Sequence, residues 1–199
     1  MISSEISWSS NIKNLFVQMP DSILPLLTVN DRMDFLDYME SGMTPKANNK
    51  LGGESVLTLM TDDHLSVKVT DDSRFDMIML EKKDGSSLLC VINTVMPQYA
   101  DSRIRFFDEN WNSIDGSGLL ERPTLGDFMT KEALKSDSLE VLFDQSLLRL
   151  STAEYRDGSL VFCYTSLDYI GDDADRFRSF FRESLEYKWN GKRFKRVGK

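Results

Sequence analysis

Five apolar runs, separated only by short polar turns, follow one another between residues 55 and 112 and constrain the fold more than any other feature. The runs are rich in Val, Ile, Leu and Phe, which fit the pleated, half-buried surface of a strand. Aspartates, serines and an Asp-Gly pair between the runs favour chain reversals. Connections this short can join only antiparallel neighbours, so the sequence predicts an antiparallel meander. Its five expected strands are 56–61, 65–70, 75–81, 88–96 and 104–107.

Helical spacing of apolar residues precedes the meander. The sequence predicts a short helix over 11–19 and a longer one over 29–41, which Thr28 or Asn30 would cap. The stripe of the longer helix is broad enough to lie on a sheet. Its expected members are Val29, Met33, Leu36 and Met39 or Glu40, widened by Phe35 and Tyr38.

A third helix and two hairpins are predicted after the meander. Residues 124–144 have a helical pattern with a break at 136–138. Each of the two expected hairpins contains a dipeptide that favours a tight turn. They are 147–152 with 159–167 across Asp157-Gly158, and 185–189 with 193–197 across Asn190-Gly191.

These elements predict an α+β fold in which helices near 29–41 and 124–144 cover one face of an antiparallel sheet. The expected organisation is a single domain over 1–199. An alternative is a duplicated helix-plus-sheet unit with halves 1–120 and 121–199, because Gly85 to Cys90 and Gly158 to Cys163 have the same spacing.

The basic residues are concentrated at the C-terminus. The chain has 24 lysines and arginines, 32 aspartates and glutamates, and a formal net charge of −8. Nine of the basic residues but only two of the acidic ones lie in 176–199, which gives this segment +7 and leaves −15 for residues 1–175. Two interpretations stay open: the basic segment closes the sheet against an acidic body, or it forms an anion-binding edge.

Few residues are suited to catalysis. His64 is the only histidine, so a Ser-His-Asp or Cys-His arrangement must use it, and a multi-histidine metal site is excluded. His64 follows an Asp-Asp turn and is expected to be exposed. Cys90 and Cys163 lie in apolar runs, where we expect buried, unbridged thiols. A carboxylate pair is the other arrangement open to a hydrolase, and no cofactor motif is present.

A calcium site is disfavoured. Asp108, Asn110 and Asn112 alternate as they do at the start of a calcium loop. However, Ser113 and Leu119 stand where such a loop needs its glycine and its bidentate glutamate. A hairpin turn accounts for the same residues, so no metal is expected.

The C-terminal hairpin is the candidate contact surface. Strand alternation should turn its aliphatic and aromatic side chains inward and its basic side chains to the other face or the turn. The basic surface could meet an anionic glycan, a lipid head group or an acidic protein, whereas the −15 on residues 1–175 disfavours nucleic acid. The expected inward residues are Leu185, Tyr187, Trp189 and Phe194. The candidate binding residues are Lys188, Lys192, Arg193, Lys195 and Arg196.

The chain resembles a family of small uncharacterised proteins of Bacteroidales that are grouped as a domain of unknown function. The residues that carry the resemblance are 25–27, 30–38 with its Asn-Asp-Arg-Met-Asp-x-Leu-Asp-Tyr motif, Gly42, 49–55 and 59–61. Family members typically begin with an export signal. The resemblance therefore implies a periplasmic, outer-envelope or secreted protein whose signal peptide has been removed, with a cytoplasmic location as the alternative. It implies no catalytic or ligand residues.

The expected function is a non-enzymatic envelope binding or assembly module, with a hydrolase that uses His64 or a carboxylate pair as the alternative. No apolar run approaches the roughly 18 residues of a membrane span. The expected partner is an anionic envelope component or another envelope protein, and the oligomeric state is left open.

Overall fold

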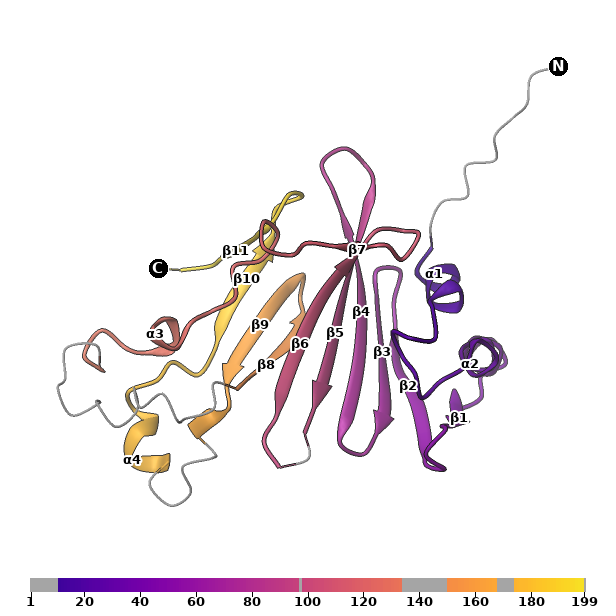
Figure 1. Ribbon diagram of the computed structural model, residues 1–199, viewed down its shortest axis with the longest axis horizontal. Helices are drawn as coiled ribbons and strands as arrows, with labels where there is room; N and C mark the ends of the chain where they lie inside the picture. Colours follow the sequence, from indigo (N-terminus) through magenta and orange to yellow (C-terminus); the bar gives the residue numbers. More distant parts are fainter. Residues whose placement is uncertain (1–10, 97, 134–149, 168–173, 199) are drawn as a thin grey trace.

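The strands form two antiparallel sheets in a computed structural model that describes residues 11–96, 98–133, 150–167 and 174–198 (Figure 1). In the first sheet the spatial order of the strands is their order in the sequence, and every neighbouring pair is antiparallel. The predicted five-stranded meander is therefore confirmed, and two short strands that were not predicted, β1 (Lys46–Asn48) and β7 (Ser113–Ile114), extend it at its two edges. The other strands are β2 (Glu54–Met60), β3 (His64–Thr70), β4 (Ser73–Glu81), β5 (Ser87–Val95) and β6 (Asp101–Phe107).

Both faces of the central strands are buried. In β4, Phe75 and Met77 face one side of the sheet, whereas Ile78 and Leu80 face the other, and each is at most 2% exposed. Strands buried on two faces need continuous apolar runs rather than strict alternation. The unbroken apolar composition of the meander is therefore a consequence of layers on both of its faces.

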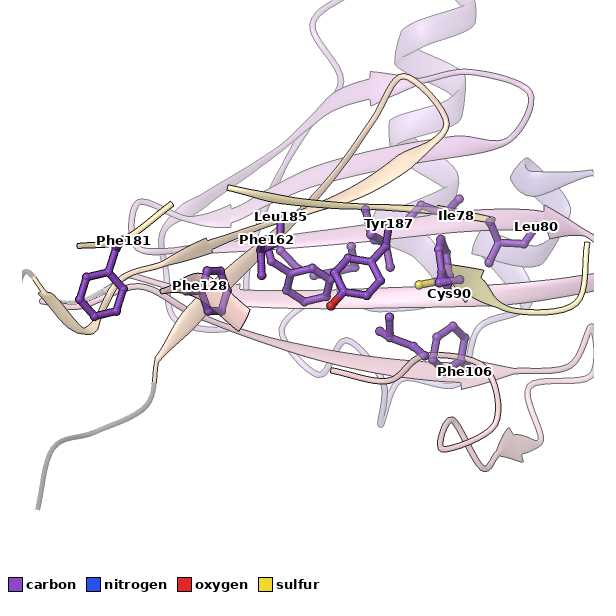
Figure 2. Packing of buried hydrophobic residues seen from close by; sticks show 14 of the residues in the cluster. Ile78, Leu80, Cys90, Phe106, Phe128, Phe162, Phe181, Leu185 and Tyr187 are labelled. Atoms are coloured by element: carbon purple, nitrogen blue, oxygen red, sulfur yellow. The ribbon is translucent and has the colours of Figure 1, made fainter. Parts of the chain in front are cut away.

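The second sheet covers one of these faces. Its strand order is β11-β10-β9-β8, and the predicted Asp157-Gly158 turn joins β8 to β9, with both turn residues at positive φ. Figure 2 shows Cys90 and Phe106 from the first sheet together with Phe162 and Tyr187 from the second in the layer between the sheets. The four strands are β8 (Ser151–Arg156), β9 (Ser159–Tyr164), β10 (Leu185–Trp189) and β11 (Phe194–Arg196).

Side chains of β6 bind the edge of β8. The backbone N–H of Ala153 donates to Ser102 Oγ at 2.9 Å, and the N–H of Ser151 donates to Asp101 Oδ1 at 3.2 Å. These bonds satisfy two amides of the outer β8 edge, which would otherwise be unpaired. They also fix the position of the second sheet on the first.

Two helices cover the opposite face, beside β1 to β3 (Figure 1). They are α1 (Ile12–Gln18) and α2 (Val29–Glu40), close to the predicted ranges. Thr28 caps α2 in a capping box with Asp31, as the sequence indicates. The described residues contain two more short helices, α3 (Leu125–Phe128) and α4 (Ala174–Arg178).

The packing of both predicted helices on one face is not confirmed. Of the region 124–144, α3 is the only α-helix among the described residues, and 134–144 lie outside them. Phe128 of α3 packs in the layer between the sheets, whereas α1 and α2 pack on the other side. The fold is α+β, but its helices are divided between the two faces.

The predicted apolar stripe of α2 is wrong in part. Val29 and Met33 are 41% and 48% exposed, whereas Phe35 and Arg32 are buried. The reason is that α2 packs beside α1 and β1 rather than flat on the sheet. Its buried surface is therefore narrower than the sequence pattern indicates.

Arg32 joins α2 to the end of α1. Its guanidinium donates to the backbone carbonyls of Val17, Met19 and Leu27, and it contacts Asp21 Oδ1 at 3.0 Å. The last carbonyls of a helix have no partner within it, so the buried cation supplies donors to them. Arg32, which the predicted apolar stripe does not include, is thereby part of the core.

Candidate anion-binding hairpin

The C-terminal hairpin consists of β10 and β11. Trp189 lies opposite Phe194, so the turn has four residues, one more than the predicted strands 185–189 and 193–197 leave between them. Asn190 Oδ1 accepts from the N–H groups of Lys192 and Arg193 at 3.0 and 2.9 Å. Asparagine stabilises turns in this way. The predicted hairpin is therefore confirmed, with a longer turn than expected.

Its aromatic side chains point inward, as predicted. Tyr187 and Phe194 are buried, and the rings of Trp189 and Phe194 lie 5.2 Å apart. Tyr187 meets Phe162 edge-on at 5.4 Å, and Phe194 lies 6.4 Å from Phe106 of the first sheet. Tyr187 and Phe194 are therefore part of the core, and the partly buried Trp189 packs against it.

Four of the five predicted basic residues are exposed. Lys188 and Lys195 lie directly opposite each other across the two strands, and Lys192 and Arg193 lie in the turn. Lys188 Nζ is 3.9 Å from Glu186 Oε1, an exposed and weak pair. Among the described residues, the other three have no ion-pair partner. Like charges that face each other across a strand pair are unfavourable, so this surface retains an electrostatic repulsion.

A second basic segment lies against the hairpin. The backbone N–H of Lys83, in the turn between β4 and β5, donates to the carbonyl of Gly191 at 3.0 Å. Trp189 Nε1 donates to the carbonyl of Glu81 at 2.6 Å. In Figure 1 both turns lie at the same end of the molecule. Lys82 and the exposed Lys83 are thereby added to the basic surface.

The close approach of the β10–β11 turn to the β4–β5 turn depends on Gly191. Its φ is +80°, and an added Cβ would lie 2.8 Å from Lys83 Cγ and 3.4 Å from the Lys83 nitrogen. A side chain at this position would be strained and would push the two turns apart. The sequence pattern identifies the glycine as a turn residue but not as a contact between sheets.

Arg196 differs from the other candidate residues. It lies opposite Tyr187, and Arg196 Nη1 contacts Asp127 Oδ1 at 2.7 Å while Nη2 donates to the Asp127 carbonyl at 3.1 Å. The pKa of the Asp127 carboxyl is lowered on balance. Desolvation acts to raise this pKa, but the hydrogen bonds from Thr124 and the interaction with Arg196 together outweigh it. Arg196 thus anchors β11 to α3 and is left out of the basic surface, which we define as Lys82, Lys83, Lys188, Lys192, Arg193 and Lys195.

His64 is buried, contrary to the expected exposure. It is 8% exposed, because Tyr155 of β8 packs edge-on against its ring at 5.3 Å. His64 Nε2 is 3.3 Å from Asp76 Oδ1, and Asp76 Oδ2 accepts from Arg74 Nε at 2.9 Å. Arg74 Nη1 also contacts Glu154 Oε1 of β8 at 3.3 Å, so this series of polar contacts joins the two sheets.

The His64 cluster lacks the features of a hydrolytic site. Cys90, in the neighbouring strand β5, is fully buried, and burial raises the pKa of its thiol. Two hollows between described residues, one beside β6 and one between α1 and α2, do not include His64. The charges of the cluster are paired with one another rather than directed at an open space.

The remaining candidates have local roles. Cys90 and Cys163 are unbridged as predicted, but Cys163 is only half-buried. Asp108 Oδ1 accepts from the N–H groups of Asn110 and Asn112, which makes it a turn residue. Over the residues that are described, no group of three or more His, Cys, Asp or Glu could hold a metal ion. No helix in the described ranges is long and apolar enough to cross a membrane.

The fold and the exposed basic hairpin define the class: an α+β protein of two antiparallel sheets that presents a charged surface. The chain belongs to the family described as "protein of unknown function (DUF3256)", whose model matches residues 5–194. It is also similar to a structure described as a domain of an uncharacterised protein from Porphyromonas gingivalis W83, with a TM-score of 0.82 and 21% identity over 94% of this chain and 98% of that one. This likeness shows the fold alone. Comparison with curated proteins finds no match.

Proposed function

We propose that the protein is a non-enzymatic binding module and that the basic surface captures an anionic polysaccharide. The observation that carries the proposal is the Lys188–Lys195 pair. A chain with a net charge of −8 holds two exposed lysines face to face on a strand pair, with only the weak Lys188–Glu186 contact between them and any acid of the described residues, beside four more cations. An anionic partner would relieve this repulsion, because it interacts favourably with every member of the surface.

The chemistry of the surface favours a polymer with repeated anionic groups. The cations extend from the turn between β4 and β5, over Lys192 and Arg193, to Lys195 on β11. Small anions need converging donors in a concave site, whereas this surface is exposed. Repeated carboxylates or sulfates along a chain could meet several of these cations at once.

Other polyanions are less well matched. Single-stranded nucleic acid requires exposed aromatic rings for stacking, and Tyr187 and Phe194 are buried. Insertion into a lipid surface requires apolar side chains beside the charges. Among residues 185–197, all of which the structure describes, the one exposed large apolar side chain is that of Val197, which is 42% exposed. A polysaccharide needs neither feature.

The proposal includes a location in the periplasm or outer envelope, where anionic polysaccharides are present. The family resemblance supports this location. Fractionation of cells that express the natural gene tests it, since recovery of the protein with the cytoplasmic fraction would contradict it. The binding proposal itself is tested independently with the purified chain.

The binding experiment compares dextran sulfate with neutral dextran. The triple variant Lys192→Ser, Arg193→Ser and Lys195→Ser should bind dextran sulfate at least about tenfold more weakly than the wild type. A matched control changes Lys46, Lys50 and Lys68 to Ser, which removes the same charge from exposed positions near the far edge of the first sheet. Equal loss of affinity in both variants would leave only a net-charge effect and would contradict the proposal.

A further inference from the structure

A cavity of about 360 Å³ lies beside the outer edge of β6, and no residue of the basic surface lines it. Its floor is apolar, and its far wall is the loop that follows β7. The loop approaches closely because residue 116 is a glycine, where an added Cβ would lie 2.8 Å from the Phe106 ring. The apolar residues that line it are Ile104, Phe106, Ile114 and Leu120.

The wall of the cavity is fixed by hydrogen bonds. The carbonyl of Gly116 accepts from the N–H groups of Leu119 and Leu120 at 2.9 and 3.0 Å. The carbonyl of Leu119 in turn accepts from the N–H of Phe194 at 2.8 Å, which ties the loop to β11. The cavity is therefore formed before any ligand binds. Binding then has a smaller entropic cost, because the loop does not have to be ordered.

One residue of β6, Ile104, borders this cavity with an unpaired outer edge. β7 pairs only with Phe106 and Phe107, and the carbonyl of Ser102 faces outward to accept from Arg122 Nη2. Outward-facing residues alternate along an antiparallel strand, so Ile104 also directs its N–H and C=O away from β5. Among the described residues, no partner occupies this side of Ile104. An exposed edge of this kind can pair with an added extended segment.

Arg122 lies at the rim of the cavity and has N–H donors that are not used within the described residues. One nitrogen, Nη2, is held by the Ser102 carbonyl, and the structure gives Nε and Nη1 no partner in the described residues. A guanidinium fixed by one bond presents its other donors in a defined direction, a geometry that suits a carboxylate. Asp115, also on the rim, is bonded by Ser117 through both carboxylate oxygens. Its negative charge disfavours a ligand that is anionic along its whole length.

We infer that this cavity binds the C-terminus of an extended peptide that ends in an apolar residue. The last side chain enters the apolar floor, the terminal carboxylate meets Arg122, and the peptide backbone pairs with Ile104. One apolar group, one charge and one backbone pair match the three features of the site. The inference does not depend on the proposed polysaccharide surface, which lies on other elements.

The test uses the acetylated hexapeptide KTVTVL, with amide NMR spectra of the full chain. The free acid should shift the signals of Ile104 and of residues 113–117. Its C-terminal amide should bind about tenfold or more weakly, because it lacks the charged partner of Arg122. N-methylation of the last two peptide amides should also weaken binding, because it prevents strand pairing. These two peptides test the site without altering the protein.

A pair of variants completes the test. Arg122→Gln should lose the preference for the free acid, whereas Arg103→Gln, which removes the same charge from an exposed position on β6 outside the cavity, should keep it. Failure of the free acid to bind would overturn the inference. Equal binding of acid and amide, or shifts confined to the basic hairpin, would also overturn it.

Discussion

Lys188 and Lys195 lie directly opposite each other on the outer face of the C-terminal hairpin. Facing like charges are destabilising, so Lys195→Thr should raise the free energy of unfolding by roughly 0.2–1 kcal/mol. Lys192→Thr, in the adjacent turn, removes the same charge without a facing partner and should change stability by less than about 0.5 kcal/mol. Urea unfolding measures both. A destabilised Lys195→Thr variant would show that the repulsion between the two lysines is not significant.

Removal of the buried guanidinium of Arg32 should destabilise the fold strongly. Arg32→Met keeps an apolar stem but leaves the carbonyls of Val17, Met19 and Leu27 without their donor, so a loss of about 3 kcal/mol is expected. Asp21 is half-exposed, and Asp21→Asn should cost less than about 1 kcal/mol. Equal losses in the two variants would mean that the ion pair, not the carbonyls, is the important interaction.

Asp127 should contribute to acid sensitivity. Its pKa is lowered in the folded state, so its stabilisation is present above the unfolded value near 3.8 and is lost as the pH falls through the folded pKa. In Asp127→Asn the loss of stability between about pH 5 and pH 3 should be smaller than in the wild type. Because Asp127 and Arg196 are partly exposed, the difference should stay below about 1 kcal/mol. Parallel pH profiles would contradict this role.

The two thiols should differ in reactivity. Burial raises the pKa of both Cys90 and Cys163, but Cys90 is inaccessible and Cys163 is half-exposed. A thiol reagent should therefore modify Cys163 slowly in the folded protein and Cys90 only after unfolding. Cys163→Ser should abolish the reaction of the folded protein. Rapid modification of Cys90 under native conditions would contradict its position between the sheets.

Local sequence patterns predict the first sheet well, because each of its turns is short and each of its strands pairs with the next. The same patterns identify the capping box at Thr28 and the inward direction of Tyr187 and Phe194. Strand alternation also predicts the exposure of Lys188 and Lys195. These features depend on neighbours in the chain, which the sequence displays directly.

Features that depend on contacts between distant segments could not be predicted. His64 is buried because β8 covers it, and nothing near His64 in the sequence indicates a second sheet. Lys82 and Lys83 join the basic surface through a bond to Gly191, which is distant in sequence. The basic pair after Glu81, in a turn, is the only local signal for their role. Asp127 likewise meets Arg196 only after folding.

The salt dependence of dextran sulfate binding tests the central claim most directly. Affinity should fall with rising salt in the wild type, because the cations of the basic surface release counterions from the polymer. The triple variant at Lys192, Arg193 and Lys195 should flatten the plot of log affinity against log salt by about 2 units, at about 0.7 per charge. The control triple at Lys46, Lys50 and Lys68 should keep the wild-type slope. Equal slopes in the wild type and the hairpin variant would contradict the claim that this surface binds polyanions.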